Sequence, residues 1–193
     1  AQGITCTVTV SFTVPQVVQA AERHRRGVAR ARRQGIEPGK CFSVIMIGRL
    51  DDYLREVAQD NQAGLSEADI RMAGVAAAKN AYRIYQEQGY EATLLIAALR
   101  GAHHLTELAG GDLIMSIAPN MQEPFIGNTL PKEERIGADV PADVLDRLRK
   151  LPEFVRACEP DGMAPPEFIG YGATQRTLSQ FAEAGWKLLE NFG

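Results

Sequence analysis

Apolar runs of strand length alternate with segments of helical periodicity over the first two-thirds of the chain. Two of these runs, 41–47 and 93–99, are apolar at almost every position, whereas a strand with one wet face alternates between apolar and polar residues. A nearly continuous apolar strand is typical of a parallel sheet, because the helices that connect parallel strands cover its faces. The sequence therefore predicts an α/β fold built on a parallel sheet with flanking helices.

Capping and turn residues set the boundaries of the expected elements. Thr13 is expected to cap the first helix and Ser66 a later, long helix, while Gly35 and Gly89 are expected to end them. We expect strands at 4–10, 41–47, 93–99 and 112–118, helices at 13–34, 51–59, 66–88, 103–109, 142–150 and 174–192, and loops at 120–140 and 157–173.

The last expected helix, 174–192, is amphipathic. Its apolar residues recur with the helical period, and they are Leu178, Phe181, Ala182, Gly185, Leu188, Leu189 and Phe192. We expect it to pack across the other elements as a closing helix.

The number of strands limits the architecture. A closed (β/α) barrel of eight strands needs about 250 residues. The four strand–helix units found here correspond to half of such a barrel.

Composition argues against several functional classes. The 193 residues are 45% apolar, enough for one sizeable core, and the net charge of −3 gives no bias toward nucleic acid or anionic membranes. No apolar stretch reaches the roughly 18 residues that span a bilayer, and no signal-peptide pattern is present.

The chain lacks an initiator Met, so we expect a processed or truncated start. Free thiols and a cytoplasmic location are favoured by three scattered cysteines, Cys6, Cys41 and Cys158.

Two arginines follow directly on the two most apolar strands. Arg49 comes after 41–47 and Arg100 after 93–99. The C-terminal ends of parallel strands form the ligand face of α/β folds, and one guanidinium can donate two hydrogen bonds to an oxyanion. This placement predicts a clamp for phosphate or carboxylate. The alternative is an ion pair that orders a loop, and the candidate carboxylates are Asp51, Asp52 and Glu107.

The adjacent histidines His103 and His104, with Glu107, raise the question of a metal site. Two adjacent histidines cannot both share one helix face with Glu107, and no third convincing ligand is evident nearby. We therefore predict no metal and no cofactor. Ordinary polar packing is the expected role of this pair, with a ligand-face role as the alternative.

A basic cluster between residues 23 and 33 could suggest nucleic-acid binding. Apolar residues run through the same segment as a buried stripe, and no aromatic residues interleave for base stacking. We interpret the cluster as the solvated face of a helix and predict no nucleic-acid partner and no membrane partner.

Four motifs, in order, resemble the transaldolase family. They are Gly3–Phe12, Gly48–Asp52 with the strand before it, Gln88–Gly101, and Glu107–Asp112. Their order and spacing are similar to strands five to eight of that family. The resemblance implies a TIM-barrel-type fold in which residues 1–120 form the C-terminal half of the barrel. Residues 121–193 would be a loop-rich, helical extension that packs on it.

The resemblance also implies an activity. The family consists of class I aldolases that transfer a dihydroxyacetone unit between sugar phosphates through a lysine Schiff base, in the pentose phosphate part of carbohydrate metabolism. The nucleophilic lysine, on strand four, and the acid/base carboxylates, on strands one and three, would precede this chain. The full-length parent would be a transferase of aldehyde or ketone groups with a sugar phosphate as its partner.

Site residues can be carried over from the family one by one. Arg49 and Arg100 match the phosphate-binding arginines, and Thr9 matches the catalytic threonine that supports the water near the Schiff base. His103 and Ser116 are further candidates for the ligand face.

Three positions depart from the family pattern. Thr7, also a candidate for the ligand face, stands where many members have a substrate-contacting asparagine, Val44 stands where many have serine, and Ala98 replaces a more polar residue. These departures leave two alternatives open: a non-catalytic sugar-phosphate-binding or assembly module, and another aldolase chemistry on the same barrel.

No lysine in the chain is a good Schiff-base candidate. Such a lysine needs a lowered pKa, by burial or by neighbouring cations, so that its free amine can attack. The lysines precede a strand, lie in helices or lie in charged stretches, and they are Lys40, Lys79, Lys132, Lys150 and Lys187. The isolated chain is therefore expected to be inactive.

A half-barrel has two open strand edges. Open apolar edges are templates for pairing. We therefore expect the chain to form a homo-oligomer or to pair with the missing N-terminal half.

Overall fold

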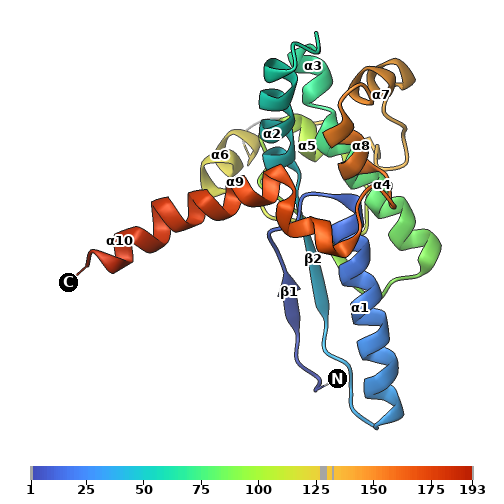
Figure 1. Ribbon diagram of the computed structural model, residues 1–193. Coiled ribbons are helices and arrows are strands. Elements are labelled where there is room, and N and C mark those ends of the chain that lie inside the picture. Colours follow the sequence, from blue (N-terminus) through green and yellow to red (C-terminus); the bar gives the residue numbers. More distant parts are fainter. Residues whose placement is uncertain (1, 127–129, 132, 193) are drawn as a thin grey trace.

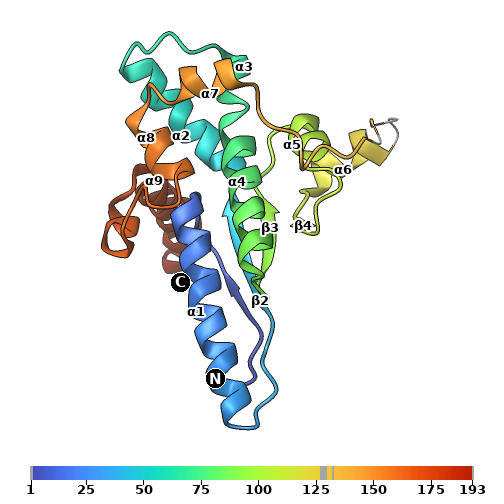
Figure 2. The same cartoon turned by 90° about the vertical axis from the view of Figure 1, so that its right-hand side faces the viewer.

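Four parallel strands form one sheet and lie in the order in which they occur along the chain. The first two are seen in Figure 1, and the third and fourth in Figure 2. The computed structural model describes residues 2–126, 130–131 and 133–192. The strands are β1 (Cys6–Val8), β2 (Cys41–Met46), β3 (Thr93–Ala97) and β4 (Ile114–Met115). The predicted parallel sheet with flanking helices is confirmed, although the two outer strands are shorter than the expected 4–10 and 112–118.

Strands β2 and β3 form the longest pairing in the sheet. Their contact runs from Phe42 opposite Thr93 to Met46 opposite Ala97. β1 pairs with the other side of β2, and β4 with the other side of β3. Because all four strands are parallel, their C-terminal ends meet at one edge of the sheet.

Helices cover one face of the sheet. α1 (Val14–Arg33) and α4 (Ala73–Gln88) pack side by side against β2 and β3 (Figure 2). Ile45 points toward these helices and is fully buried. On the opposite face Phe42 and Leu95 are only half-buried, and every residue of β1 is exposed. The expectation that helices cover both faces is therefore met on one face only.

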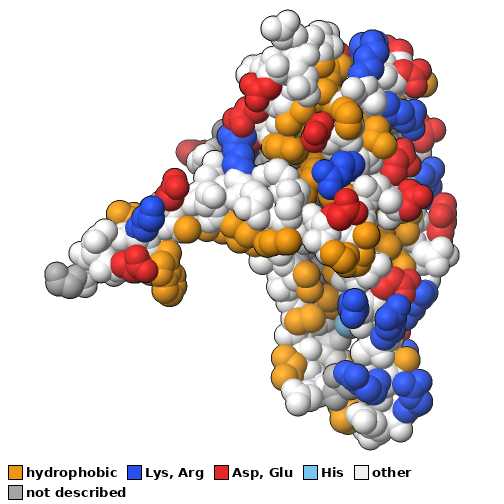
Figure 3. Space-filling model, in the orientation of Figure 1, with side chains coloured by type: hydrophobic (Ala, Val, Ile, Leu, Met, Phe, Trp, Pro, Cys, Tyr) orange, Lys and Arg blue, Asp and Glu red, His pale blue; other side chains and the backbone are white. Residues whose placement is uncertain are grey.

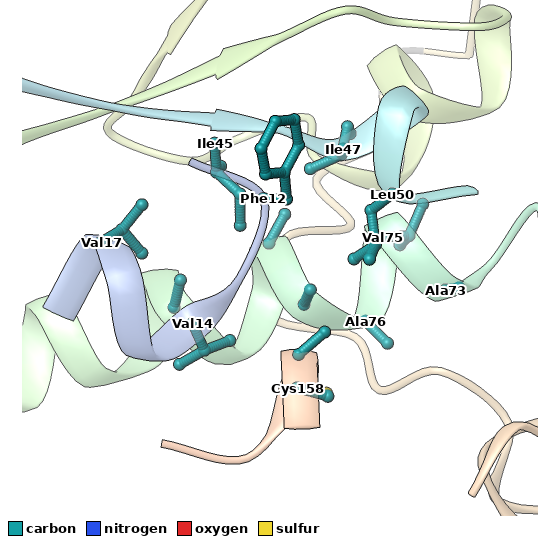
Figure 4. Close-up of a cluster of buried hydrophobic side chains, with 14 of the residues drawn as sticks. Phe12, Val14, Val17, Ile45, Ile47, Leu50, Ala73, Val75, Ala76 and Cys158 are labelled. Atoms are coloured by element: carbon teal, nitrogen blue, oxygen red, sulfur yellow. The ribbon is translucent and has the colours of Figure 1, made fainter. Parts of the chain in front are cut away.

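The hydrophobic core lies between this covered face and the helices. Figure 4 shows Phe12 beside Ile45 of β2 and Ile47, the first residue of α2 (Ile47–Asp60), with Val75 of α4 across from them. Burying each large apolar side chain contributes about 1.5–3 kcal/mol. These contacts fix the strand ends relative to the helices that follow them.

Predicted caps delimit the first helix. The Thr13 hydroxyl accepts a hydrogen bond from the Gln16 N–H at 3.4 Å, and α1 ends before Gly35, whose φ is +68°. Gly89 follows α4 with φ +59°. Each of these glycines adopts the left-handed backbone that favours glycine at a helix end.

The second helix begins earlier than expected. α2 (Ile47–Asp60) starts directly after β2, whereas the sequence predicted a helix at 51–59. Its cap position, Met46, makes no side-chain capping bond, and its first turn is held instead by Ile47 and Leu50, both fully buried. Arg49 therefore lies in the first turn of a helix and not in a loop.

The long helix expected at 66–88 is two helices. α3 (Glu67–Ile70) begins with a reciprocal capping box between Ser66 and Asp69. Arg71 and Met72 separate it from α4.

Helices also form in the segments expected to be loops. The expected helices at 103–109 and 142–150 correspond to α5 (Ala102–Glu107) and α7 (Ala142–Leu148). The helices that sequence reasoning missed are α6 (Pro119–Ile126), α8 (Pro152–Cys158) and the 3-10 helix η1 (Pro165–Gly170). Phe154 of α8 and Tyr171, directly after η1, are almost fully buried, so tertiary packing overrides the local turn signals at these two positions. The division of the chain at residue 120 stays a prediction.

The C-terminal helix projects away from the rest of the chain. α9 (Gly172–Phe181), the π-helical turn η2 (Ala182–Trp186) and α10 (Lys187–Glu190) follow one another without a break. Figure 1 shows this segment extending past β1, and Figure 3 shows hydrophobic side chains along it. Thr177 is buried, but Leu189 is 67% exposed. The expected closing helix is therefore wrong for its second half, because only its first turns pack against described residues.

Across residues 2–126, 130–131 and 133–192, no helix is both long enough and apolar enough to cross a membrane.

Candidate functional site

The segments that follow β2 and β3 touch at Gly48. A Cβ at Gly48 would lie 2.6 Å from the Arg100 Cγ atom and would overlap the carbonyl oxygen of Ala98. Only glycine permits this approach of the two backbones. Arg49, in the first turn of α2, and Arg100, between β3 and α5, therefore become neighbours at the C-terminal edge of the sheet.

Arg100 is engaged by an ion pair with Asp52. Its Nε and Nη2 atoms donate to the Asp52 Oδ2 atom at 3.0 and 2.6 Å, and Nη1 donates to the carbonyl oxygen of Ala98 at 2.9 Å. Asp52 also accepts a hydrogen bond from Arg55 at 3.1 Å. Burial would raise the pKa of Asp52, but hydrogen bonds and charge from both arginines hold it below its usual value. The ion-pair alternative is thus realised at Arg100, with Asp52 as the partner.

Arg49 is held by the C-terminal helix. Its Nη1 atom donates to the Gln180 Oε1 atom at 2.6 Å, and its guanidinium carbon lies 5.1 Å from the centre of the Phe181 ring. Burial lowers the pKa of Arg49, and the charge of the nearby Arg100 lowers it further. Among the described residues Arg49 forms no ion pair. The site therefore holds two neighbouring guanidiniums and one carboxylate, Asp52, which pairs with Arg100 and Arg55 but not with Arg49. This charge arrangement favours an anion.

Backbone strain marks the ends of two strands. Val10, just after β1, has φ +59°, and Ala98, just after β3, has φ +58°. This left-handed conformation is unfavourable for residues other than glycine, above all for a β-branched one, and costs about 1–3 kcal/mol. Such strain concentrates at functional sites. Both residues lie at the C-terminal edge of the sheet, where Arg49 and Arg100 meet.

The predicted polar residues of the ligand face are exposed. Thr7 lies opposite Phe42, so its side chain shares the half-open face of the sheet. Thr9 follows the last residue of β1, and Ser116 continues the β4 ladder by donating its N–H to Ile96 at 2.8 Å. In the described structure no hydrogen bond joins Thr7, Thr9 or Ser116 to either arginine. Their catalytic and ligand-face roles stay predictions.

His103 points toward the junction of α3 and α4. Its Nδ1 atom lies 2.9 Å from the Nη2 atom of Arg71. Burial, together with the charges of the neighbouring His104 and Arg71, lowers the pKa of His103 to about 4. The imidazole is therefore neutral at pH 7.

Sequence reasoning missed a buried pair formed by Asp51 and His104. The His104 Nε2 atom donates to the Asp51 Oδ2 atom at 2.9 Å, and the two side chains are 0% and 1% exposed. The His104 Nδ1 atom accepts a hydrogen bond from the Arg100 backbone N–H at 3.1 Å, and the Asp51 Oδ1 atom accepts one from the Gly74 N–H at 2.7 Å. The residues of the pair are far apart in the chain, so no local spacing signals their contact.

Asp51 is a third potential metal ligand beside His103 and His104, and the sequence alone did not indicate that it lies near them. Ligand atoms of Asp51, His103 and His104 lie within 4.8 Å of one another. A histidine that binds a metal through one ring nitrogen normally donates a proton from the other. In His104 the Nδ1 atom instead accepts from the Arg100 N–H, so Nε2 carries the proton. This donor pattern favours a hydrogen-bonded pair over a metal site.

Glu107 and the lysines lie away from this site. The Lys79 Nζ atom donates to Glu107 at 3.2 Å and to the carbonyl oxygens of Arg135 and Ala138 at 2.8 and 2.6 Å. Glu107 also binds Arg135, so it is not the partner of Arg49 or Arg100. Lys40 is exposed at the opposite end of β2, Lys150 and Lys187 are exposed on the C-terminal segment, and Lys132 lies outside the described residues.

Comparison with known proteins identifies related sequences. Residues 1–159 match the family model described as Transaldolase/Fructose-6-phosphate aldolase. The chain is 27% identical to a transaldolase of Gibberella intermedia over 142 residues, which cover 74% of this chain and 38% of that protein. It is also 27% identical to a transaldolase of Pseudoalteromonas atlantica over 135 residues, which cover 70% of this chain and 36% of that protein. The chain thus spans less than two-fifths of the length of these relatives.

We predict that the Gly48→Ala substitution destabilises the chain by about 1–3 kcal/mol, because the new methyl group must displace the Ala98 carbonyl and Arg100. Chemical denaturation monitored by circular dichroism measures this change. Gly27→Ala is the matched control, since Gly27 also lies in a helix but has open space around it. That control should leave stability unchanged or raise it by up to about 1 kcal/mol. Equal stability of the Gly48→Ala variant and the unsubstituted chain would contradict the close approach.

Proposed function

The chain belongs to the transaldolase/fructose-6-phosphate aldolase family, and from this premise we propose that it contributes the phosphate-binding side of a sugar-phosphate-converting (β/α) barrel. In this proposal its sheet supplies strands five to eight of the barrel. Residues 1–120 carry these strands, and residues 121–193 form an extension that packs on them. The observation that carries the proposal is the meeting of Arg49 and Arg100 at the C-terminal edge of a parallel sheet.

The architecture supports this placement. In a closed barrel, helices cover the outer face of the sheet while the inner face is filled by side chains from opposite strands. Here α1 and α4 cover one face, and the other face leaves Phe42 and Leu95 half-buried. A second set of strands would bury that face and pair with the outer edges of β1 and β4.

The charge distribution supports a phosphate ligand. Arg49 has only the neutral Gln180 and Thr177 as hydrogen-bond partners among the described residues. Arg100 binds Asp52 with two of its five N–H groups. A phosphate dianion between the two arginines would accept hydrogen bonds from both guanidiniums and replace Gln180 at Arg49. Each charge-assisted hydrogen bond to a phosphate contributes about 1.5–3 kcal/mol.

The chemistry in this proposal belongs to the full-length parent. A lysine amine of the parent attacks the ketone carbon of the sugar phosphate, and water leaves as the Schiff base forms. Thr9, at the end of β1, would hold the water next to that carbon. The parent would then break the adjacent carbon–carbon bond and release the first aldehyde, while the dihydroxyacetone unit stays on the lysine. That unit would bond to an acceptor aldehyde, and water would hydrolyse the Schiff base to release the product and the free amine, as expected for carbohydrate metabolism through the pentose phosphate pathway.

A non-catalytic phosphate-binding or assembly module is the second candidate. Two observations favour it: the apolar Val44 and Ala98 replace polar residues of the family pattern, and Arg100 is already paired with Asp52. A third possibility, another aldolase chemistry on the same barrel, uses the same arginines. We propose a cytoplasmic location for either function, supported by the free state of Cys6, Cys41 and Cys158. Recovery of the protein outside the cytoplasmic fraction of fractionated cells would contradict that location.

Phosphate binding can be measured by isothermal titration calorimetry with fructose 6-phosphate and with inorganic phosphate, using fructose as the uncharged control. We expect Arg49→Ala and Arg100→Ala each to weaken phosphate binding about 10- to 100-fold, because each removes a charged donor. Arg83→Ala is the matched control, since Arg83 is an exposed arginine on α4 that contacts Asn80 and Glu87. Equal affinities for all three variants would exclude the clamp.

Schiff-base formation by the chain itself can be tested by intact mass spectrometry after borohydride reduction with fructose 6-phosphate. We expect the 21.1 kDa species to gain no adduct, because the buried Lys79 amine already donates to three acceptors and the other described lysines lie outside the site. Glucitol 6-phosphate, which has no carbonyl group, is the matched sugar control. A stable adduct mapped to one lysine would show that the chain is catalytic by itself.

Association through the open edge of β1 is also part of the proposal. Light scattering should show a second copy binding as concentration rises. Val8→Lys should reduce this association, because a lysine on an edge strand opposes further strand pairing. Ile169→Lys places the same charge on an exposed residue of η1 and is the control. A monodisperse monomer at high concentration would contradict self-association and leave pairing with the N-terminal half.

A further inference from the structure

The buried pair of Asp51 and His104 connects three helices to the backbone of Arg100. Asp51 lies on α2, His104 on α5, and Gly74 at the start of α4. The connection runs from the Gly74 N–H through the Asp51 carboxylate and the His104 imidazole to the Arg100 N–H, with successive distances of 2.7, 2.9 and 3.1 Å. Each polar atom of the two side chains has one partner, so the network is fully satisfied.

The network has a single direction of donation. The Arg100 N–H can only donate, so the His104 Nδ1 atom accepts and its Nε2–H donates to Asp51. Both oxygens of Asp51 then accept, one from His104 and one from Gly74. A satisfied polar network in a water-free interior holds its members in one geometry. Here that geometry includes the peptide group that precedes the Arg100 side chain.

Consecutive aspartates therefore hold both ends of Arg100. Asp52 binds the guanidinium directly at 2.6 Å, whereas Asp51 reaches the backbone through His104. Arg49 lies on the same turn of α2, two residues before Asp51. Because Arg49 lies on α2, and Asp51 and Asp52 of the same helix connect to Arg100, a movement of α2 would shift both arginines together.

We propose that Asp51 and His104 are positioning residues that set the Arg100 backbone, and with it the guanidinium, for phosphate binding. This inference rests on the proposed phosphate role of Arg100. Burial of a carboxylate and an imidazole is unfavourable without hydrogen-bond partners. If these two positions served only to fill the core, apolar side chains would do so without that cost. The pair is nevertheless fully buried, with every polar atom of its two side chains hydrogen-bonded, and it ends on the backbone of Arg100.

The test is a double-mutant cycle in phosphate affinity, measured on the full chain with inorganic phosphate and fructose 6-phosphate. His104→Leu keeps an apolar side chain in the cavity but removes both hydrogen bonds, and it should weaken binding about tenfold. In the Arg100→Ala background the same substitution should change the affinity by less than about twofold, because coupled residues are non-additive. Equal effects of His104→Leu in both backgrounds would mean a structural role only and would overturn the inference.

Conservative replacement provides a second readout. His104→Gln can accept from the Arg100 N–H through its amide oxygen and donate to Asp51 through its amide nitrogen, so it should restore affinity to within about threefold of the unsubstituted chain. Asp51→Asn keeps the shape of Asp51 but loses one of its two acceptor atoms, and it should weaken binding about fivefold or more. If His104→Leu does not fold, the cycle is run with Asp51→Asn and Arg100→Ala, and additivity there contradicts the inference.

A control separates positioning from general stability. Glu107→Gln weakens another partly buried network, with Lys79 and Arg135, that does not touch either site arginine. It should lower the denaturation midpoint without changing phosphate affinity. Loss of affinity in the Glu107→Gln variant to the same extent as in Asp51→Asn would overturn the inference. If the Arg100→Ala variant alone binds phosphate as tightly as the unsubstituted chain, the proposed phosphate role of Arg100 is contradicted instead. Failure of the proposed function is thereby distinguished from failure of the positioning role of Asp51 and His104.

Discussion

The parallel pairing of β2 with β3 determines the arrangement of everything at the candidate site. Its register places Met46 opposite Ala97, so the two segments that leave the sheet start side by side. Gly48 then fits against the Ala98 carbonyl, and Arg49 and Arg100 become neighbours. A shift of one residue in this register would place each arginine beside the wrong backbone and would turn the buried side chains of the shifted strand to the other face.

The fold was predictable where the signals are local. Apolar runs located the two central strands, and Thr13, Gly35 and Gly89 mark helix ends through hydrogen bonds and backbone angles that depend on nearby residues. The start of α2 was not predictable, because no side-chain cap marks it and buried contacts of Ile47 and Leu50 hold its first turn. Helix α8 was missed for the same reason: Phe154, Ala157 and Cys158 are buried against residues distant in sequence, and local signals do not report that packing.

The site divides in the same way. The positions of Arg49 and Arg100 at the strand ends follow from the rule that parallel strands share one ligand edge. Their partners do not, since Asp52 was one of three candidate carboxylates and Gln180 lies in a helix that only the tertiary structure brings near. Asp51 and His104 lie on two helices from different strand–helix units. Neither their residue types nor their spacing in the sequence predicts that they form a hydrogen bond.

The helix that holds Arg49 is the same helix that projects beyond the rest of the chain. Gln180 and Phe181 contact Arg49, and directly after them the π-helical turn at Ala182–Trp186 interrupts regular α-helical hydrogen bonding. A ligand that displaces Gln180 and a neighbour that binds the exposed residues beyond it would therefore act on the same helix. Thermodynamic linkage then requires reciprocity: whatever factor the neighbour imposes on ligand affinity, the ligand imposes on the affinity of the neighbour. Binding of an anion at the site and association with the neighbour would therefore be coupled, and each would change the affinity of the other by the same factor.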